Sequence, residues 1–394
     1  MSVKQGPGDA VWRSRGAKLG GRKVAHSRTG IPYYYREGVV VVPAERLDDL
    51  RAALRRAKIA GKEVRVSDIP PSGYAEVTID RKGTRVDALV EDLGADLDVE
   101  PDYVAFPGTH VKGFAASRPA PYRAKVSPRP RRGRGAGVVV GVVDLSFFDP
   151  AKAGHPPWAT AGVHIDAAGA VPRNDRVHPP YVGHGNAVIG IVKQLAPDAT
   201  VVAVTIPSAP GDTPGITSDR ALATAIERIL CRNKIHILVI PFGGSTRHGT
   251  MPLTEAALEP YLPTTSVYAS AGNDGLDPTT YPAVDPEVFG VGAWSADAAK
   301  LGWTGRACRS VLRPDAAFGR LGLATWSNRG AAAALGAPGV AVPAPFVTGD
   351  LRIRPGAADR SGPASSQRFD GWALFTGTSF AAAVAAGCHA VATC

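Results

Sequence analysis

The chain has 394 residues, of which 44% are apolar, and its mean hydropathy is −0.03. Such a chain can bury a full core, and its length suits either two domains or one large α/β domain with an appendage. It contains no run of 18 or more uncharged apolar residues, and residues 1–29 hold no apolar stretch of signal-peptide length. We therefore expect no membrane association and a cytoplasmic location.

The formal net charge is +10, and the excess lies entirely before residue 136, because residues 136–394 contain equal numbers of basic and acidic residues. It is concentrated in two basic flanks, residues 1–28 and 118–135, on either side of a mildly acidic stretch. A nucleic-acid groove normally places its charge on a folded face. Solvated basic tails are therefore the better interpretation, and we expect no nucleic-acid partner.

The cysteines and carboxylates give no sign of a metal site. No two cysteines have C-x-x-C spacing, and no cluster of alternating carboxylates suits calcium. Free thiols are the default in a cytoplasmic compartment, and a disulfide framework is not expected for a domain of this size. We predict no metal and no cofactor, and free thiols at Cys231, Cys308, Cys388 and Cys394.

The first 117 residues divide into a tail and a small domain. Residues 1–32 lack a periodic apolar pattern and are predicted to be a disordered basic tail. Beyond them the apolar pattern alternates between the periods of strands and of helices. The β-α-β-β-α-β order is that of a ferredoxin-like α+β domain, to which we assign residues 33–117. Its predicted elements are strands Val39–Val42, Glu63–Val66, Tyr74–Ile79 and Tyr103–Phe106, with helices Pro43–Ala57 and Thr84–Leu93.

Residues 118–136 are dense in Pro, Gly and Arg, which predicts an exposed linker. The remaining residues, 137–394, alternate β-branched strands with helices, as in a doubly wound parallel α/β sheet. The predicted strands are Gly137–Val143, Val201–Ile206, Ile235–Ile240 and Thr265–Ala269, and the predicted helices are Asn186–Gln194, Ser218–Arg232 and Leu253–Glu259.

Four polar residues occupy positions at which doubly wound sheets commonly carry catalytic or binding side chains. Asp144 and Asn273 follow strand ends, whereas His184 lies at a helix start. Ser379 opens the helix of FTGTSFAAAVAAG, where free backbone N–H groups favour negative charge on an atom bonded to the serine oxygen. Each residue taken alone has an ordinary interpretation as a helix cap or a turn residue.

The order Asp144, His184, Asn273, Ser379 resembles that of the subtilisin-like serine peptidases, and the resemblance covers about residues 136–394. It implies a sheet of subtilisin type, with Ser379 as nucleophile, His184 as general base and Asp144 orienting the imidazole. Asn273 and the Ser379 backbone N–H would stabilise the oxyanion. No catalytic atom is lost where the chain departs from the family pattern, at Leu145, Ser146, Asn186, Pro241 and Ala383.

The segments IPFGG and SAGN are similar to the two walls of the family's substrate pocket. They hold no charged residue, so we expect tolerance for apolar or bulky side chains. Gly243 and Gly244 are equally interpretable as turn glycines. The substrate-binding residues implied are Phe242, Gly243, Gly244, Ser270, Ala271 and Gly272. Two long insertions, about residues 296–324 and 346–372, are expected to cover part of the sheet.

The N-terminal domain looks like the inhibitory propeptide of many subtilases, and VEPDYVAFP, ending at Pro107, is similar to a propeptide end. The resemblance implies that the domain docks on the catalytic domain and that residues 107–117 enter the substrate groove. An unrelated ferredoxin-like module and a permanent accessory domain remain alternatives.

The sequence thus predicts a serine endopeptidase that acts on a peptide or protein substrate. The alternative is a catalytically weak scaffold of the same fold that binds peptides. An esterase or a sedolisin-type peptidase is disfavoured, because sedolisins replace the catalytic histidine with glutamate, whereas this chain has His184 followed by Gly185.

Overall fold

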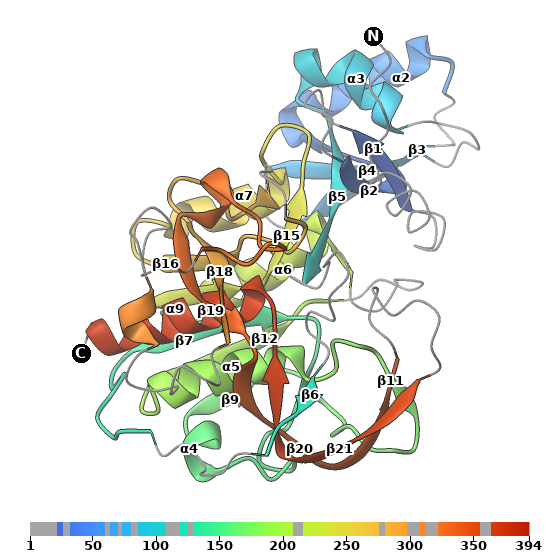
Figure 1. Ribbon diagram of the computed structural model, residues 1–394. Coiled ribbons are helices and arrows are strands. Elements are labelled where there is room, and N and C mark those ends of the chain that lie inside the picture. The colour runs from blue at the N-terminus through green and yellow to red at the C-terminus, as the bar shows by residue number, and fades with distance from the viewer. Residues whose placement is uncertain are drawn as a thin grey trace.

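A computed structural model of the chain is drawn in Figure 1, with the N-terminal unit above the larger C-terminal unit. It describes residues 22–26, 32–59, 64–69, 73–79, 86–107, 119–123, 130–207, 216–275, 280–297, 307–311, 322–354 and 364–393. Among these residues no helix is long and apolar enough to cross a membrane.

The N-terminal unit is an antiparallel sheet with two helices. Its four central strands lie in the order β5-β2-β4-β3, and the helices are inserted after the first and third of them along the chain. This is the predicted β-α-β-β-α-β arrangement, and Leu50 and Leu54 of the first helix are fully buried in its core. The elements are β1 (Arg22–His26), β2 (Pro32–Pro43), η1 (Ala44–Arg46), α2 (Leu47–Arg56), β3 (Val64–Ile69), β4 (Tyr74–Ile79), α3 (Val86–Leu97) and β5 (Glu100–Pro107).

Two stretches predicted to lack structure are partly ordered. Residues 22–26 form β1, an antiparallel partner of β2, and Pro32 is the first residue of β2, so the expectation of disorder is wrong at these positions. The other residues of the predicted tail lie outside the described residues. In the predicted linker, β6 (Ala120–Pro121) pairs with Leu374 and Ala373. Nearer the C-terminal unit, the Asp198 N–H donates to the Arg134 carbonyl. Backbone pairing therefore ties both described parts of the linker to the C-terminal unit.

The C-terminal unit is built on a parallel sheet of seven strands, which confirms the doubly wound α/β prediction. Helices α5 (His184–Leu195) and α9 (Thr378–Ala392) pack together on one face, while α6 (Asp219–Leu230) and α7 (Pro252–Leu258) cover the other. The strand order is β19 (Leu335–Val340), β18 (Phe289–Asp297), β16 (Ser266–Ser270), β14 (Ile237–Ile240), β7 (Val139–Asp144), β12 (Thr200–Thr205) and β9 (Val163–Ile165).

Three of these strands were not predicted. β18 and β19 contain two glycines each, and β19 also contains a proline, so their composition resembles a loop. The glycines serve close packing, because a Cβ on Gly336 would lie 2.4 Å from the Trp294 ring. β9 has only 3 residues, too few for a periodic signal.

The second predicted insertion contains most of a long hairpin, β20 (Val342–Ile353) and β21 (Ser365–Phe375). This hairpin packs against α5, where Gln194 Nε2 donates to the Pro343 carbonyl at 2.8 Å. The remaining short elements are β8 (Phe147–Phe148), α4 (Pro157–Thr160), β10 (Ala168–Gly169), β11 (Val177–His178), β13 (Thr217–Ser218), β15 (Phe242–Ser245), η3 (Glu259–Tyr261), β17 (Thr280–Tyr281), η4 (Cys308–Ser310) and η5 (Gly330–Ala333).

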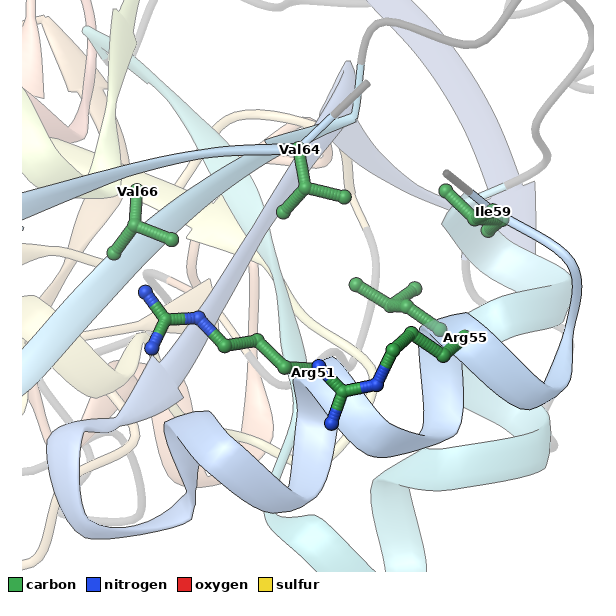
Figure 2. A pocket seen from close by; sticks show the side chains of 6 residues that line it. Arg51, Arg55, Ile59, Val64 and Val66 are labelled. Carbon is green, nitrogen blue, oxygen red and sulfur yellow. The ribbon is translucent and has the colours of Figure 1, made fainter. Parts of the chain in front are cut away.

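A cavity of about 410 Å³ lies in the N-terminal unit, between α2 and β3. Figure 2 shows Arg51 and Arg55 of α2 at this cavity, opposite Val64 and Val66 of β3. All of its lining residues belong to the N-terminal unit, so it is separate from the four residues proposed for catalysis.

The prediction of free thiols is wrong for two cysteines. Cys308 in η4 and Cys388 in α9 form a disulfide, because the fold brings their Cα atoms to 5.2 Å across a sequence separation of 80 residues. Sequence spacing carried no sign of this long-range pairing. Cys231 is free and exposed. Disulfides persist mainly in oxidising compartments, which weighs against the expected cytoplasmic location.

We expect Cys308→Ala to lower the free energy of unfolding by ~4 kcal/mol, because the bridge closes a long loop in the unfolded chain. Chemical denaturation measures this loss, and Cys231→Ala, which removes an exposed free thiol, serves as the control with little change. Alkylation of Cys308 and Cys388 in the unfolded, unreduced protein would contradict the bridge.

Candidate active site

Asp144 and His184 meet at the carboxyl end of the sheet. Asp144 is the last residue of β7 and His184 the first residue of α5. The Asp144 Oδ2 atom lies 2.7 Å from His184 Nδ1, while Asp144 Oδ1 accepts the Leu145 N–H at 2.8 Å. Both side chains are at most 2% exposed. The carboxylate thus fixes the orientation of the imidazole through a short buried hydrogen bond.

The second imidazole nitrogen of His184 makes no comparable hydrogen bond within the described residues. His184 Nε2 is buried and has no hydrogen-bond partner among the described residues. Aromatic rings hold the imidazole: the Phe380 centroid lies 5.1 Å from it and the Phe242 centroid 6.1 Å. Phe380 directly follows Ser379, so the ring contact also places the start of α9 beside the histidine.

Ser379 lies in the first turn of α9, after a sharp entry at Gly377. The Gly377 backbone has φ 153° and ψ 160°, a region that glycine alone adopts readily. The fully buried Ser379 hydroxyl donates to the Pro241 carbonyl at 3.0 Å. This contact uses the backbone carbonyl of Pro241 and does not depend on the side chain at that position.

The Asn273 side chain is fixed at its oxygen and open at its nitrogen. Its Oδ1 atom accepts the Thr378 N–H at 3.0 Å, and the Thr378 hydroxyl accepts the Gly272 N–H at 3.1 Å. Asn273 Nδ2 is buried and has no partner within the described part of the chain. An amide held in this way presents donors beside the start of α9, where they suit a developing negative charge.

Asn186 holds the segment after Asp144 in place. Its Oδ1 atom accepts the Phe148 N–H at 3.0 Å, and its Nδ2 atom donates to the Phe148 carbonyl at 2.8 Å. Gly185 is needed for the same contact, because a Cβ there would lie 2.6 Å from the Phe147 ring. Sequence reasoning missed the role of Asn186, since no local pattern joins it to Phe148.

The structure brings the two predicted pocket segments together. Phe242, Gly243 and Gly244 lie in β15, and a Cβ on Gly243 would lie 3.5 Å from the Ser270 carbonyl. Ser270, Ala271 and Gly272 form the end of β16 and the turn after it. Phe242 is fully buried against the His184 ring, so its side chain supports the histidine.

Figure 1 shows β5 reaching from the N-terminal unit to the neighbourhood of β15 in the C-terminal unit. Ala105 and Val104 pair with β13, and Phe106 and Pro107 pair with β15, both antiparallel. A Cβ on Gly244 would lie 2.7 Å from the Val104 carbonyl, so this glycine permits the close approach of a strand. The segment predicted to continue into the groove, residues 108–117, lies outside the described residues.

Charged groups accompany this strand pairing. Arg220 of α6 reaches Glu76 of β4, with Nη1 2.7 Å from Oε1. The Arg220 N–H also donates to Asp102 Oδ1 at 3.4 Å, and Asp102 is held at 2.8 Å by Arg36. Burial raises the pKa of Asp102, which is fully enclosed.

Two further groups titrate near this interface. Burial raises the pKa of Asp219 to about 7, although its carboxylate accepts the Leu253 and Thr254 N–H groups. Burial also raises the pKa of Glu100, which accepts a hydrogen bond from Tyr103. No group of three or more His, Cys, Asp or Glu side chains in the described ranges could hold a metal ion.

Comparison with known proteins identifies the family of the chain. The family model of the subtilases matches residues 135–393. The chain belongs to the subtilase family. It is 26% identical, over 172 residues, to the subtilisin-like protease het-Q2 of Podospora anserina; the match covers 41% of this chain and 47% of that protein. The subtilase chain therefore spans about half the length of this curated relative.

Among solved structures, the fold is similar to that of fervidolysin from Fervidobacterium pennivorans, a keratinolytic enzyme related to subtilisin. The TM-score is 0.55 at 19% identity, with 91% of this chain and 54% of the fervidolysin chain covered. A cold-adapted subtilisin-like serine proteinase matches at 17% identity and a TM-score of 0.42, over 70% of this chain and 81% of that one.

Proposed function

We propose that this subtilase is a serine endopeptidase that uses Asp144, His184 and Ser379 as its catalytic triad. The observation that carries the proposal is the 2.7 Å contact of His184 Nδ1 with the buried Asp144 carboxylate, close to the start of α9. His184 Nε2 accepts the Ser379 proton as the hydroxyl attacks a peptide carbonyl, and later gives it to the leaving amine. Asp144 stabilises the imidazolium that forms in between.

The oxyanion of the tetrahedral intermediate is held by Asn273 Nδ2 and by the Ser379 backbone N–H. The buried Nδ2 atom has no other partner in the described structure, and the N–H belongs to the first turn of α9. The attack requires the Ser379 hydroxyl to turn from the Pro241 carbonyl towards His184. Such rearrangement is usual, because catalytic hydrogen bonds often tighten only when substrate binds.

The substrate is a peptide or protein segment in extended conformation. It pairs with β13 and β15 as the end of β5 does, and Gly244 leaves room for its backbone. The N-terminal domain therefore competes with substrate for the same strand edges. Because the domain is tethered, its effective concentration is on the order of millimolar for a short linker, so even weak docking restrains the enzyme.

A second candidate is a scaffold of subtilase fold that binds peptides without cutting them. The observation that favours it is the strand pairing itself, since a groove that accepts a third strand binds a peptide whether or not the serine reacts. The buried Asp144–His184 pair favours the enzyme, because peptide binding has no need of it.

The two candidates are separated by labelling with a fluorophosphonate probe. We expect covalent attachment at Ser379, because the probe needs a nucleophile activated by a base. Attachment should be lost in Ser379→Ala and kept in Ser310→Ala, which changes a buried serine in η4. If neither the full-length chain nor its processed form is labelled, the scaffold is supported and the enzyme is ruled out.

We expect Asn273→Ala to lower kcat by ~10²–10³-fold and to change KM little, because the amide acts on the tetrahedral oxyanion. Steady-state hydrolysis of a peptide substrate measures both constants. An unchanged kcat with a raised KM would make Asn273 a binding or turn residue.

We expect Ala105→Glu to raise peptide hydrolysis by the full-length chain. Ala105 is fully buried and pairs with β13, and the pairings of β5 with β2 involve only residues up to Tyr103. A buried carboxylate at this position therefore opposes docking while the N-terminal sheet keeps its pairings. The matched control is Ala57→Glu at the exposed end of α2, which should leave the rate unchanged.

The same restraint can be tested with separated parts. Residues 29–117, added to a chain that begins near Gly135, should inhibit that shorter chain. Two results together would contradict the restraint: the shorter chain is folded and active but is not inhibited by the fragment, and Ala105→Glu hydrolyses peptide at the wild-type rate. The N-terminal domain would then be a permanent accessory domain.

A further inference from the structure

The turn that carries Asn273 needs support from outside itself. β16 ends at Ser270, and Gly272 has a left-handed φ of 99°. The Thr378 contacts fix the Asn273 amide on the side of α9. They leave the turn's other polar atoms, the Ala271 and Gly272 carbonyls and the Asp274 N–H, to be satisfied elsewhere. An oxyanion donor has to be held to within roughly 0.5 Å to act on the transition state.

Asn328 supplies that support on both sides of Asn273. Its Nδ2 atom donates to the Ala271 carbonyl at 2.9 Å, and its backbone N–H donates to the Gly272 carbonyl at 2.9 Å. Its Oδ1 atom accepts the Asp274 N–H at 3.0 Å. One residue thus satisfies polar backbone atoms of the two residues before the catalytic amide and of the one after it.

Asn328 is itself held firmly to the sheet. It is 1% exposed, and its Nδ2 atom makes a second contact, at 3.2 Å, with the hydroxyl of Thr280. The neighbouring Ser327 hydroxyl accepts the Ala293 N–H of β18 at 3.0 Å. The Gly275 N–H also donates to the Trp326 carbonyl at 2.8 Å. Residues 326–328 therefore connect the turn to a central part of the fold.

We propose that Asn328 is a positioning residue for peptide hydrolysis, which fixes the turn so that Asn273 Nδ2 meets the oxyanion. The inference rests on the proposed function, because Asn328 acts on the proposed oxyanion donor. No sequence motif indicated this residue. Asn328 touches no reacting atom, and its whole effect on the rate passes through Asn273.

The side chain must be asparagine because the turn presents groups of both kinds. The Ala271 carbonyl needs a donor and the Asp274 N–H needs an acceptor, and a primary amide offers both at the required separation. Aspartate has the same shape but no donor, so it sets a carboxylate oxygen against the Ala271 carbonyl. Space is also tight: a Cβ on Gly272 would lie 2.3 Å from Asn328 Nδ2.

The test is a double-mutant cycle in the full-length chain, with active sites counted by end-point fluorophosphonate labelling. Asn328→Asp should lower kcat roughly 10- to 100-fold and leave KM within about twofold, because displacement of a transition-state donor acts on turnover. In the Asn273→Ala background, Asn328→Asp should cause no further loss, because the donor it positions is gone.

A matched control is Asn233→Asp, which removes the same kind of bond, Nδ2 to the Ile229 carbonyl at 2.9 Å, at the end of α6. It should leave kcat unchanged. Thermal unfolding of every variant separates loss of fold from loss of position.

Losses that multiply in the double mutant, or a raised KM with unchanged kcat, would overturn the role of Asn328 while leaving the peptidase intact. Should Asn328→Asp fail to fold, Asn328→Ser, which keeps a small polar group, takes its place in the cycle, and the same two outcomes decide. A wild-type chain that never reacts with the probe overturns both this inference and the proposed function.

Discussion

The position of Ser379, the proposed nucleophile, depends on one helix that passes through the interior. Residues from Thr378 to Ala386 are at most 2% exposed, and most of them are alanine. Large side chains have no room there, because a Cβ on Gly387 would lie 3.0 Å from Leu195 and one on Gly339 would lie 3.1 Å from the Ala381 side chain. Close packing on all sides holds the start of α9, and with it Ser379, in a fixed position.

The other polar groups reach this helix because parallel strands end at one edge. Asp144 ends β7, Pro241 follows β14, and Asn273 lies in the turn after β16. These three strands are neighbours in the sheet, so their carboxyl ends lie side by side. His184 then enters from α5, which packs directly against α9. Each polar group therefore lies at or just after the end of a strand, or at the start of a helix, and hydrogen bonds to neighbouring residues fix its position.

Sequence reasoning reaches the groups that have local signatures and misses those defined by distant contacts. The strand end at Asp144 and the helix start at His184 could be predicted, because strand ends and helix starts have recognisable composition. Asn328 has no such signature, since its partners lie more than 40 residues earlier in the chain. The Cys308–Cys388 bridge was missed for the same reason. Strand β19 was missed because its glycines and proline serve packing while resembling a loop.

Strand β5 joins the two units: its first half pairs with β2, and its second half pairs with β13 and β15. A cut in the chain after Pro107 leaves all of these backbone pairings in place, together with the Arg220–Glu76 ion pair. Severing the connection and vacating the groove are therefore separate events with separate rates. After such a cut, the time for which the two parts stay together is set by how slowly the paired strand edges come apart.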